Sequence, residues 1–171
     1  MSSISYNGKT YPIAGDLPNV GSRAPDIMLV NTDLQNVSLS NWSGKRKIMN
    51  IFVSVDTEVC ATSVVKFSAM AEGHDDIAML MVSYDLPFAH SRFLDEKSIR
   101  NVSALSAVRH AGFGENYGVL ITEGPLTGMF SRAVVVLDEN NTVVHAEHIE
   151  DIETEPDYEA AFNALGIDIE T

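Results

Sequence analysis

Cysteine is almost absent from this chain: its 171 residues include a single one, Cys60. One cysteine excludes a disulfide within the chain, and a lone thiol is typical of a reducing compartment. The first residues lack the basic and apolar regions of a secretory signal. The sequence therefore predicts a cytoplasmic protein, and it makes the single thiol the first feature to explain.

Positive charge and long hydrophobic runs are also scarce. The chain has 11 Lys and Arg residues against 24 Asp and Glu residues, which gives a formal net charge of −13. Because this charge repels phosphates, it argues against a nucleic-acid partner and against anionic membrane surfaces. The longest uncharged, largely apolar run covers residues 48–55, far short of the ~18 residues that a membrane span requires. We therefore expect neither a nucleic acid nor a membrane as a partner.

The remaining composition is that of a globular domain. Hydrophobic residues make up 45% of the chain and charged residues 20%, which is enough to fill a core without disulfides or metals. No repeat, low-complexity segment or interdomain linker interrupts the sequence, and ~150 residues is a usual size for one domain. The whole chain, residues 1–171, is therefore expected to form a single domain.

Hydrophobic periodicity in the first half of the chain predicts an α/β fold. The dipeptide Asn7–Gly8, between two short apolar segments, is typical of a β-hairpin turn. Residues 47–55 form a near-continuous apolar run, as in a central strand covered on both faces. A helix is expected over residues 58–72 with an N-cap at Asp56–Thr57, and residues 77–83 form the next strand. This strand–helix–strand order has the size of a right-handed βαβ unit.

The second half of the chain predicts a β-hairpin followed by a helix. Residues 132–137 are apolar and mostly β-branched, and residues 142–149 follow a polar turn as the partner strand. A last helix is expected over residues 155–165, with Pro156 in its first turn. Shorter elements are expected at 27–30, 37–39, 85–94, 102–105 and 106–117. The order of elements indicates a central mixed sheet with helices on both faces, preceded by an N-terminal β-hairpin.

Cys60 lies in the first turn of the predicted helix. There the free backbone N–H groups and the positive end of the helix dipole favour a thiolate. The helix terminus supplies about 0.3–1 kcal/mol, whereas holding a thiol as its thiolate at neutral pH takes roughly 3 kcal/mol. A cation or a second hydrogen-bond donor is therefore required near the sulfur.

Two residues are candidates for that role. Thr57 precedes Cys60 by three residues, so one helical turn can bring its hydroxyl and the sulfur into the same cavity. Arg132 stands at the head of a predicted strand, where a rigid backbone would position a cation that keeps its charge. We therefore take Cys60, Thr57 and Arg132 as the candidate catalytic residues. Glu58 acts in the opposite sense, because its carboxylate disfavours a second negative charge nearby.

The spacing of residues argues against several other kinds of site. Thiol–disulfide oxidoreductases carry Cys-x-x-Cys at such a strand-to-helix junction, but here Thr57 stands in the first position, so the site has one thiol. His145 and His148 are three apart in a predicted strand and point to opposite faces. No spacing resembles a zinc site, and no glycine-rich segment follows a strand as a phosphate loop does. The sequence therefore predicts neither a metal nor a bound cofactor.

Several long blocks of the sequence occur in a specific order: GKRKIMNIF (44–52), DTEVCATSVVKF (56–67), DLPFAHSRF (85–93), SRAVVVLDEN (131–140) and TEPDYEAA (154–161). In these blocks the chain resembles the bacterial thiol peroxidases, a subfamily of the peroxiredoxins, and the second block resembles their peroxidatic loop and helix. The resemblance extends over nearly the whole chain. It implies a thioredoxin-like fold and a homodimer.

The same resemblance implies an activity. Members of this family reduce hydrogen peroxide and organic hydroperoxides through a cysteine sulfenic acid. Cys60 matches their peroxidatic cysteine, Thr57 their catalytic threonine and Arg132 their catalytic arginine.

Three positions depart from the family pattern. Val53 stands where the motif Pro-x-x-x-Thr-x-x-Cys has its proline, which helps to shape and shield the cysteine pocket. Leu94 stands where the atypical two-cysteine members usually carry a resolving cysteine, and Glu58 where a glycine is common. Without a second cysteine, an external thiol must reduce the sulfenic acid. That thiol is a low-molecular-weight thiol, a redoxin such as thioredoxin, or Cys60 of another subunit.

Two other classes of function remain open on the sequence alone. A relative whose turnover is weakened by these departures would keep the fold and act as a peroxide sensor or binding module. A cysteine hydrolase would need a histidine within hydrogen-bond reach of Cys60. Arg92 and Arg109 are weaker candidates for the pocket than Arg132, and we expect them at the surface.

Overall fold

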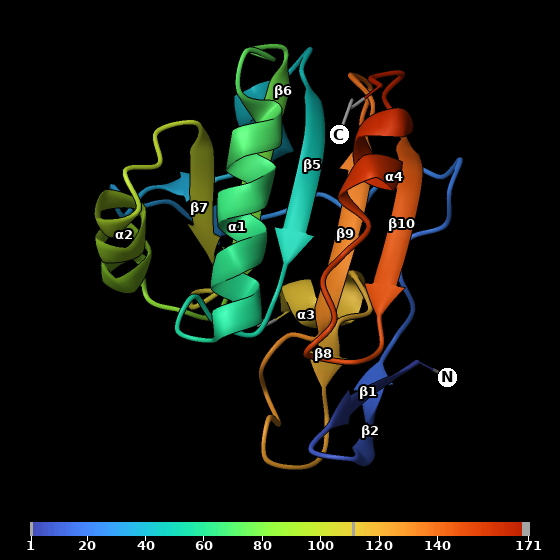
Figure 1. Cartoon of the computed structure of the whole chain (residues 1–171). Coiled ribbons are helices and arrows are strands. Elements are labelled where there is room, and N and C mark those ends of the chain that lie inside the picture. The colour runs from blue at the N-terminus through green and yellow to red at the C-terminus, as the bar shows by residue number, and fades with distance from the viewer. Residues whose placement is uncertain (1, 111, 169–171) are drawn as a thin grey trace.

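The computed structural model describes residues 2–110 and 112–168. Its centre is a seven-stranded mixed sheet with the strand order β10-β9-β5-β6-β7-β3-β4 (Figure 1). The strands are β3 (Leu29–Val30), β4 (Asn36–Val37), β5 (Arg46–Ile51), β6 (Ile77–Ser83), β7 (Val102–Ser106), β9 (Arg132–Leu137) and β10 (Val143–Ile149). β5, β6 and β7 run parallel, whereas β9 pairs antiparallel with both β5 and β10.

Helices cover both faces of this sheet, which explains why its central strands are apolar on both sides. Figure 1 shows α1 (Glu58–Ala71) and α4 (Tyr158–Asn163) on one face. Phe67 of α1 and Phe162 of α4 belong to the same buried cluster as Ile48 of β5. A second cluster on the opposite face includes Leu39 and Phe113, which come from the two short helices η1 (Leu39–Trp42) and α3 (Gly112–Asn116). α2 (Pro87–Glu96) packs beside β7.

The core of the fold is the unit that the sequence pattern predicts. β5, α1 and β6 form the parallel βαβ unit, and β9, β10 and α4 complete the sheet from the other side. The strand order β10-β9-β5-β6, with α1 and α4 on one face, is the thioredoxin-like arrangement. The predicted mixed sheet flanked by helices is therefore confirmed.

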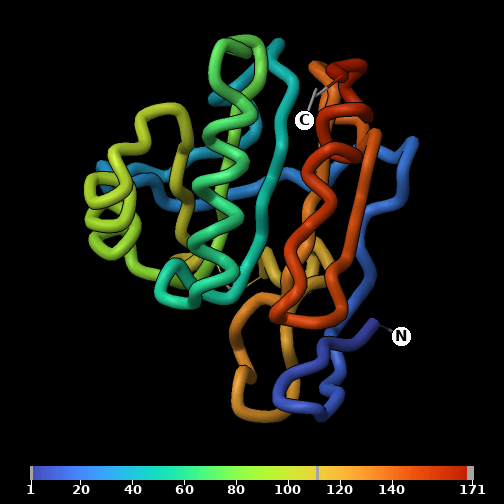
Figure 2. The backbone as a smooth tube through the Cα atoms, viewed as in Figure 1, coloured from blue at the N-terminus to red at the C-terminus, as the bar shows by residue number. Residues whose placement is uncertain are grey.

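The N-terminal hairpin forms a separate three-stranded sheet. β1 (Ser3–Tyr6) pairs with β2 (Lys9–Ala14), and β2 pairs in turn with β8 (Leu120–Ile121), as the tube in Figure 2 shows. Asn7 and Gly8 have φ values of 52° and 77°, the backbone that a tight hairpin turn of this kind requires. The two-residue strand β8 was absent from our prediction, because its partner lies more than a hundred residues away.

The hairpin also holds a segment that is important for the site. The backbone N–H of Ser5 donates to the carbonyl of Glu150 at 2.7 Å, and the N–H of Ile152 donates to the carbonyl of Ser5 at 3.2 Å. β1 therefore fixes the loop that follows β10. This loop lies on the same face of the main sheet as α1.

The predicted end of β5 and both predicted ends of the last helix, 155 and 165, are wrong. β5 ends at Ile51 rather than at residue 55, because the chain turns into a loop before α1. The last helix begins at Tyr158, so Pro156 precedes the helix instead of lying in its first turn. Asp157 is the N-cap, and its carboxylate accepts the backbone N–H of Ala160 at 3.0 Å. Within the described residues, no helix is long and apolar enough to cross a membrane.

Candidate active site

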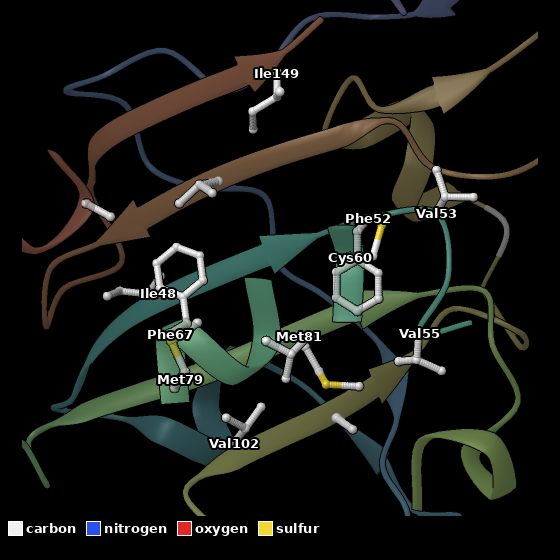
Figure 3. Close-up of a cluster of buried hydrophobic side chains, with 14 of the residues drawn as sticks. Ile48, Phe52, Val53, Val55, Cys60, Phe67, Met79, Met81, Val102 and Ile149 are labelled. Atoms are coloured by element: carbon white, nitrogen blue, oxygen red, sulfur yellow. The ribbon is translucent and has the colours of Figure 1, made fainter. Parts of the chain in front are cut away.

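Cys60 is the third residue of the 14-residue helix α1, and its side chain is fully buried. Figure 3 shows it in the same buried apolar cluster as Phe52 and Val53. The buried sulfur is thus surrounded by hydrocarbon at the positive end of a helix.

The carbonyl of Cys60 is tied to the central sheet through two buried polar side chains. The Ser63 hydroxyl donates to the Cys60 carbonyl at 2.7 Å, and the side-chain amide of Asn50 on β5 donates to the Ser63 oxygen at 3.0 Å. Both side chains are at most 2% exposed. Because β5 is the middle strand of the sheet core, these bonds hold the first turn of α1 on a rigid support.

Thr57 is the N-cap residue of α1, so its backbone forms the start of the helix that carries Cys60. Its hydroxyl donates to the carbonyl of Ser54 at 2.9 Å. The hydroxyl proton is therefore committed within the loop, and the lone pairs of the oxygen stay available as acceptors. No hydrogen bond among the described residues joins this hydroxyl to the Cys60 sulfur.

Arg132 lies on the same face of the sheet as Cys60. β9 pairs with β5 so that Ala133 is opposite Ile51, which brings Arg132 next to Phe52. Side chains alternate along β9, and Val134 belongs to the cluster under α1, so the Arg132 side chain enters from that face. The residue is only 1% exposed.

The Arg132 guanidinium is held by carbonyl groups. Its Nη1 donates to the carbonyl of Ile152 at 3.1 Å and also to the carbonyl of Thr154. Within the described residues its Nε has no hydrogen-bond partner, and no carboxylate forms an ion pair with it. Glu155 acts on this cation at longer range, since its pKa is lowered by hydrogen bonds from Lys66 and Tyr158 and also by the charge of Arg132. A buried cation without a direct ion pair favours a further negative charge nearby.

A pocket of about 520 Å³ opens at the N-terminus of α1. Thr57, Glu58 and Val59 line one side of it, and Ile152 and Glu153 line another. The pocket therefore lies between the turn that precedes Cys60 and the loop whose carbonyls hold Arg132. Among the candidate residues, Thr57 lines this pocket, whereas Cys60 and Arg132 are buried.

Sequence reasoning missed one buried carboxylate next to the site. Asp85 follows β6 by two residues and accepts hydrogen bonds from the Ser54 hydroxyl at 2.7 Å, the Val55 N–H at 2.9 Å and the Ser83 hydroxyl at 2.6 Å. Burial acts to raise the pKa of Asp85, but the nearby His90 imidazole and the hydrogen bonds from Ser83, Ser54 and Val55 outweigh it and lower that pKa to about 2. Its position in the sequence could have indicated this role. Asp85 lies just after β6, and the loops after parallel strands such as β5 and β6 meet at the same edge of the sheet.

The remaining basic candidates lie away from the thiol. Arg92 is half exposed and pairs with Asp56 and Glu96, and Arg109 binds the backbone and side chain of the β3–β4 segment. Both are surface residues, as expected. No histidine of the described part of the chain is hydrogen-bonded to Cys60: His90 binds Ser83 and His148 binds Ser131. Across the same residues, no group of three or more His, Cys, Asp or Glu residues could hold a metal ion.

The low pKa of Asp85 predicts a pH-dependent contribution to stability. Because the pKa in the folded state is about 2 and the usual value is 3.8, the contribution is present above about pH 4 and is lost as the pH falls toward 2. It amounts to about 2 kcal/mol. We expect Asp85→Asn to lower the free energy of unfolding at neutral pH by about this amount, and the difference from the parent protein to shrink below pH 4. Urea unfolding at several pH values measures it, and a difference that is constant with pH would contradict the assignment.

Comparison with known proteins identifies the family. Residues 19–162 match the Redoxin family model. A thiol peroxidase of Corynebacterium glutamicum is 42% identical over 165 residues, which are 96% of this chain and 99% of that protein. Among solved structures, a thiol peroxidase from Chromobacterium violaceum has a TM-score of 0.90 at 26% identity and covers 96% of this chain and 95% of its own. A peroxiredoxin-like protein from Aquifex aeolicus has the same TM-score at 32% identity, with 97% of both chains covered. On this similarity along almost its full length, the chain belongs to the Redoxin family.

Proposed function

We propose that this chain is a thiol-dependent peroxidase that reduces hydrogen peroxide and organic hydroperoxides with Cys60 as the attacking residue. The observation that carries the proposal is the only thiol of the chain, at the N-terminus of α1, on the same sheet face as a buried arginine that makes no direct ion pair among the described residues. Similarity to named thiol peroxidases supports it.

In the oxidation step the Cys60 thiolate attacks one oxygen of the peroxide. A sulfur–oxygen bond forms as the oxygen–oxygen bond breaks, and the leaving oxygen takes up a proton to depart as water or an alcohol. Sulfur is oxidised to sulfenic acid and the peroxide is reduced. No bound cofactor or metal is needed, because the thiolate supplies both electrons.

Arg132 and the first-turn amides of α1 stabilise the charges of this step. The guanidinium balances the thiolate before attack and the negative charge that develops on the leaving oxygen during it. Its Nη1 is already fixed by two carbonyls, so little reorganisation accompanies the reaction. Low polarity around Cys60 strengthens this attraction compared with water.

Thr57 orients the peroxide. Since its hydroxyl proton is bound to the Ser54 carbonyl, its oxygen faces the substrate as an acceptor. A hydroperoxide carries an O–H that can donate to it. This bond would hold the peroxide in line for attack by the sulfur.

The catalytic cycle requires an external thiol, because Cys60 is the only cysteine. The first thiol attacks the sulfenic acid, releases water and forms a mixed disulfide with Cys60. A second thiol attacks this disulfide, restores the Cys60 thiol and leaves as the oxidised reductant. A sulfur–sulfur bond is about 2.05 Å long, so the fully buried Cys60 must become exposed for this half of the cycle.

We also propose the organisation of the protein as a homodimer of single-domain subunits, residues 1–171, in the cytoplasm. Hydrogen bonds of Ser5 join the small sheet to the loop that follows β10 of the main sheet, which supports one domain. Leu86 and Phe88 are 52% and 67% exposed at the start of α2, and such apolar side chains suit a protein interface. The lone thiol suits a reducing compartment.

Neither alternative function is favoured by the site. A cysteine hydrolase lacks its histidine at Cys60 among the described residues, as stated above. A peroxide sensor without turnover would require a disabled site, whereas Cys60, Thr57 and Arg132 are all retained, with Thr57 lining a pocket at the N-terminus of α1. Val53 and Glu58 leave the helix terminus intact.

Replacement of the nucleophile tests the proposal directly. We expect stopped-flow measurements to show that reduced protein reacts with hydrogen peroxide many orders of magnitude faster than a free thiol. Mass spectrometry should then find one added oxygen on Cys60, and two after excess peroxide. Cys60→Ser should abolish peroxide consumption. Retained consumption in this variant would exclude Cys60 as the nucleophile.

Replacement of the buried cation tests the role of Arg132. Arg132→Met removes the charge while keeping an apolar side chain in the core, so we expect it to fold. The rate of oxidation should fall about a hundredfold, and the thiolate absorbance at neutral pH should decrease. Arg109→Met, which removes a surface arginine, is the matched control and should change neither. Equal behaviour of the two variants would remove Arg132 from the site.

The mass of the protein in solution tests the proposed homodimer. Light scattering coupled to size-exclusion chromatography should give twice the mass of one chain at micromolar concentration. Phe88→Ser should shift the protein toward the mass of one chain, because it removes exposed apolar area. A monomeric parent protein at that concentration would contradict the homodimer.

A further inference from the structure

A network of polar side chains lies beside the proposed site at the edge of the sheet where β5 and β6 end. Both strands are parallel, with Ile51 opposite Val82, so the segments that follow them meet in space. One of these segments leads into α1 and carries Thr57. The other carries Asp85, whose side chain is only 11% exposed.

The Asp85 carboxylate clamps the loop between β5 and α1. Two of its three hydrogen-bond donors, the Ser54 hydroxyl at 2.7 Å and the Val55 N–H at 2.9 Å, belong to that loop. Bonds to an ionised carboxylate are about twice as strong as neutral ones. The third donor, the Ser83 hydroxyl at 2.6 Å, belongs to β6 and ties the carboxylate to the sheet.

Ser83 is itself bound to a buried histidine of α2. Its oxygen lies 2.8 Å from Nε2 of His90, which is fully buried in α2. The same imidazole nitrogen is 3.7 Å from the Asp85 carboxylate. The carboxylate is thus attached to two elements that do not belong to the loop, so it can act as a fixed anchor for it.

Ser54 connects this anchor to Thr57. Its carbonyl accepts both the backbone N–H of Thr57 at 3.2 Å and the Thr57 hydroxyl at 2.9 Å. Its hydroxyl oxygen accepts the N–H of Asp56 at 3.0 Å while donating to Asp85. Ser54 is therefore bound to the Asp85 carboxylate through its hydroxyl and to Thr57 through its carbonyl.

We propose that Asp85 and Ser54 are positioning residues for the peroxide reaction, which act through Thr57. Asp85 holds Ser54, and the Ser54 carbonyl holds the Thr57 hydroxyl with its proton turned away from the substrate. The hydroxyl is thereby fixed as an acceptor for the O–H of the hydroperoxide. This inference rests on the proposed function, because it assigns a role in that same reaction.

A double-mutant cycle tests whether Ser54 acts through Thr57. The rate constant for oxidation of Cys60 by hydrogen peroxide is measured for the parent protein, Ser54→Ala, Thr57→Val and the double variant. We expect Ser54→Ala to lower the rate about tenfold in the parent background, because a loosened acceptor is misplaced. In the Thr57→Val background the same change should cost less than about twofold, since its target is gone.

Two further variants separate positioning from simple stability. Ser54→Thr keeps the hydroxyl and should keep the rate. Ser68→Ala, at the far end of α1, removes a comparable hydrogen bond to Asn101 of 2.6 Å and should leave the rate unchanged. Thermal unfolding of each variant gives its stability. If Ser54→Ala does not fold, Asp85→Asn replaces it in the cycle.

The outcomes distinguish this inference from the proposed function. A parent protein that reacts no faster than a free thiol would overturn the proposed function and this inference with it. A fast parent protein with additive losses in the cycle, or with an unchanged rate in Ser54→Ala, would overturn the inference alone. If Ser54→Ala and Ser68→Ala lowered the oxidation rate equally, the inference would also be overturned, because the rate would then depend on the stability of the protein and not on the position of Thr57.

Discussion

The buried positive charge of Arg132 is the constraint on which the site depends. A guanidinium cannot lose its proton, so its burial is tolerated only where oxygen atoms or an anion face it. The carbonyls of Ile152 and Thr154 supply part of that environment. They belong to a loop that β1 holds through Ser5, so the small N-terminal sheet contributes to the site from outside the main sheet. In the proposed reaction, the Cys60 thiolate supplies further negative charge to this site.

Burial of the thiol follows from the same arrangement. Cys60 lies in the first turn of α1 on the buried side of the helix, and this turn is bound to β5 through Ser63 and Asn50. In the proposed mechanism, exclusion of water strengthens the attraction between the Cys60 thiolate and the Arg132 guanidinium and protects the sulfenic acid from other reactants. It also separates the two halves of the cycle, because a small peroxide can reach a recessed sulfur far more easily than a second thiol can.

Much of the fold and the main candidates could be predicted from residue patterns. The central run of β5, the helix α1 and the strand β6 follow from local periodicity, which burial on both faces of a sheet produces directly. Cys60 stands out as the only thiol, and Thr57 and Arg132 follow from helical spacing and a strand end. The end of β5 and the start of α4 were misplaced, since caps and loop hydrogen bonds decide boundaries.

The sequence by itself determined the chemistry available: one thiol, no internal disulfide, and a helix that begins just before that thiol. Only the tertiary structure decided which distant groups surround it. Arg132 binds carbonyls twenty and more residues away, and Asp85 binds Ser54 across 31 positions. No local pattern encodes such pairs, because they depend on strand register and on which loops meet at one edge of the sheet. The direction of the Thr57 hydroxyl was decided in the same way, by a hydrogen bond that exists only in the folded loop.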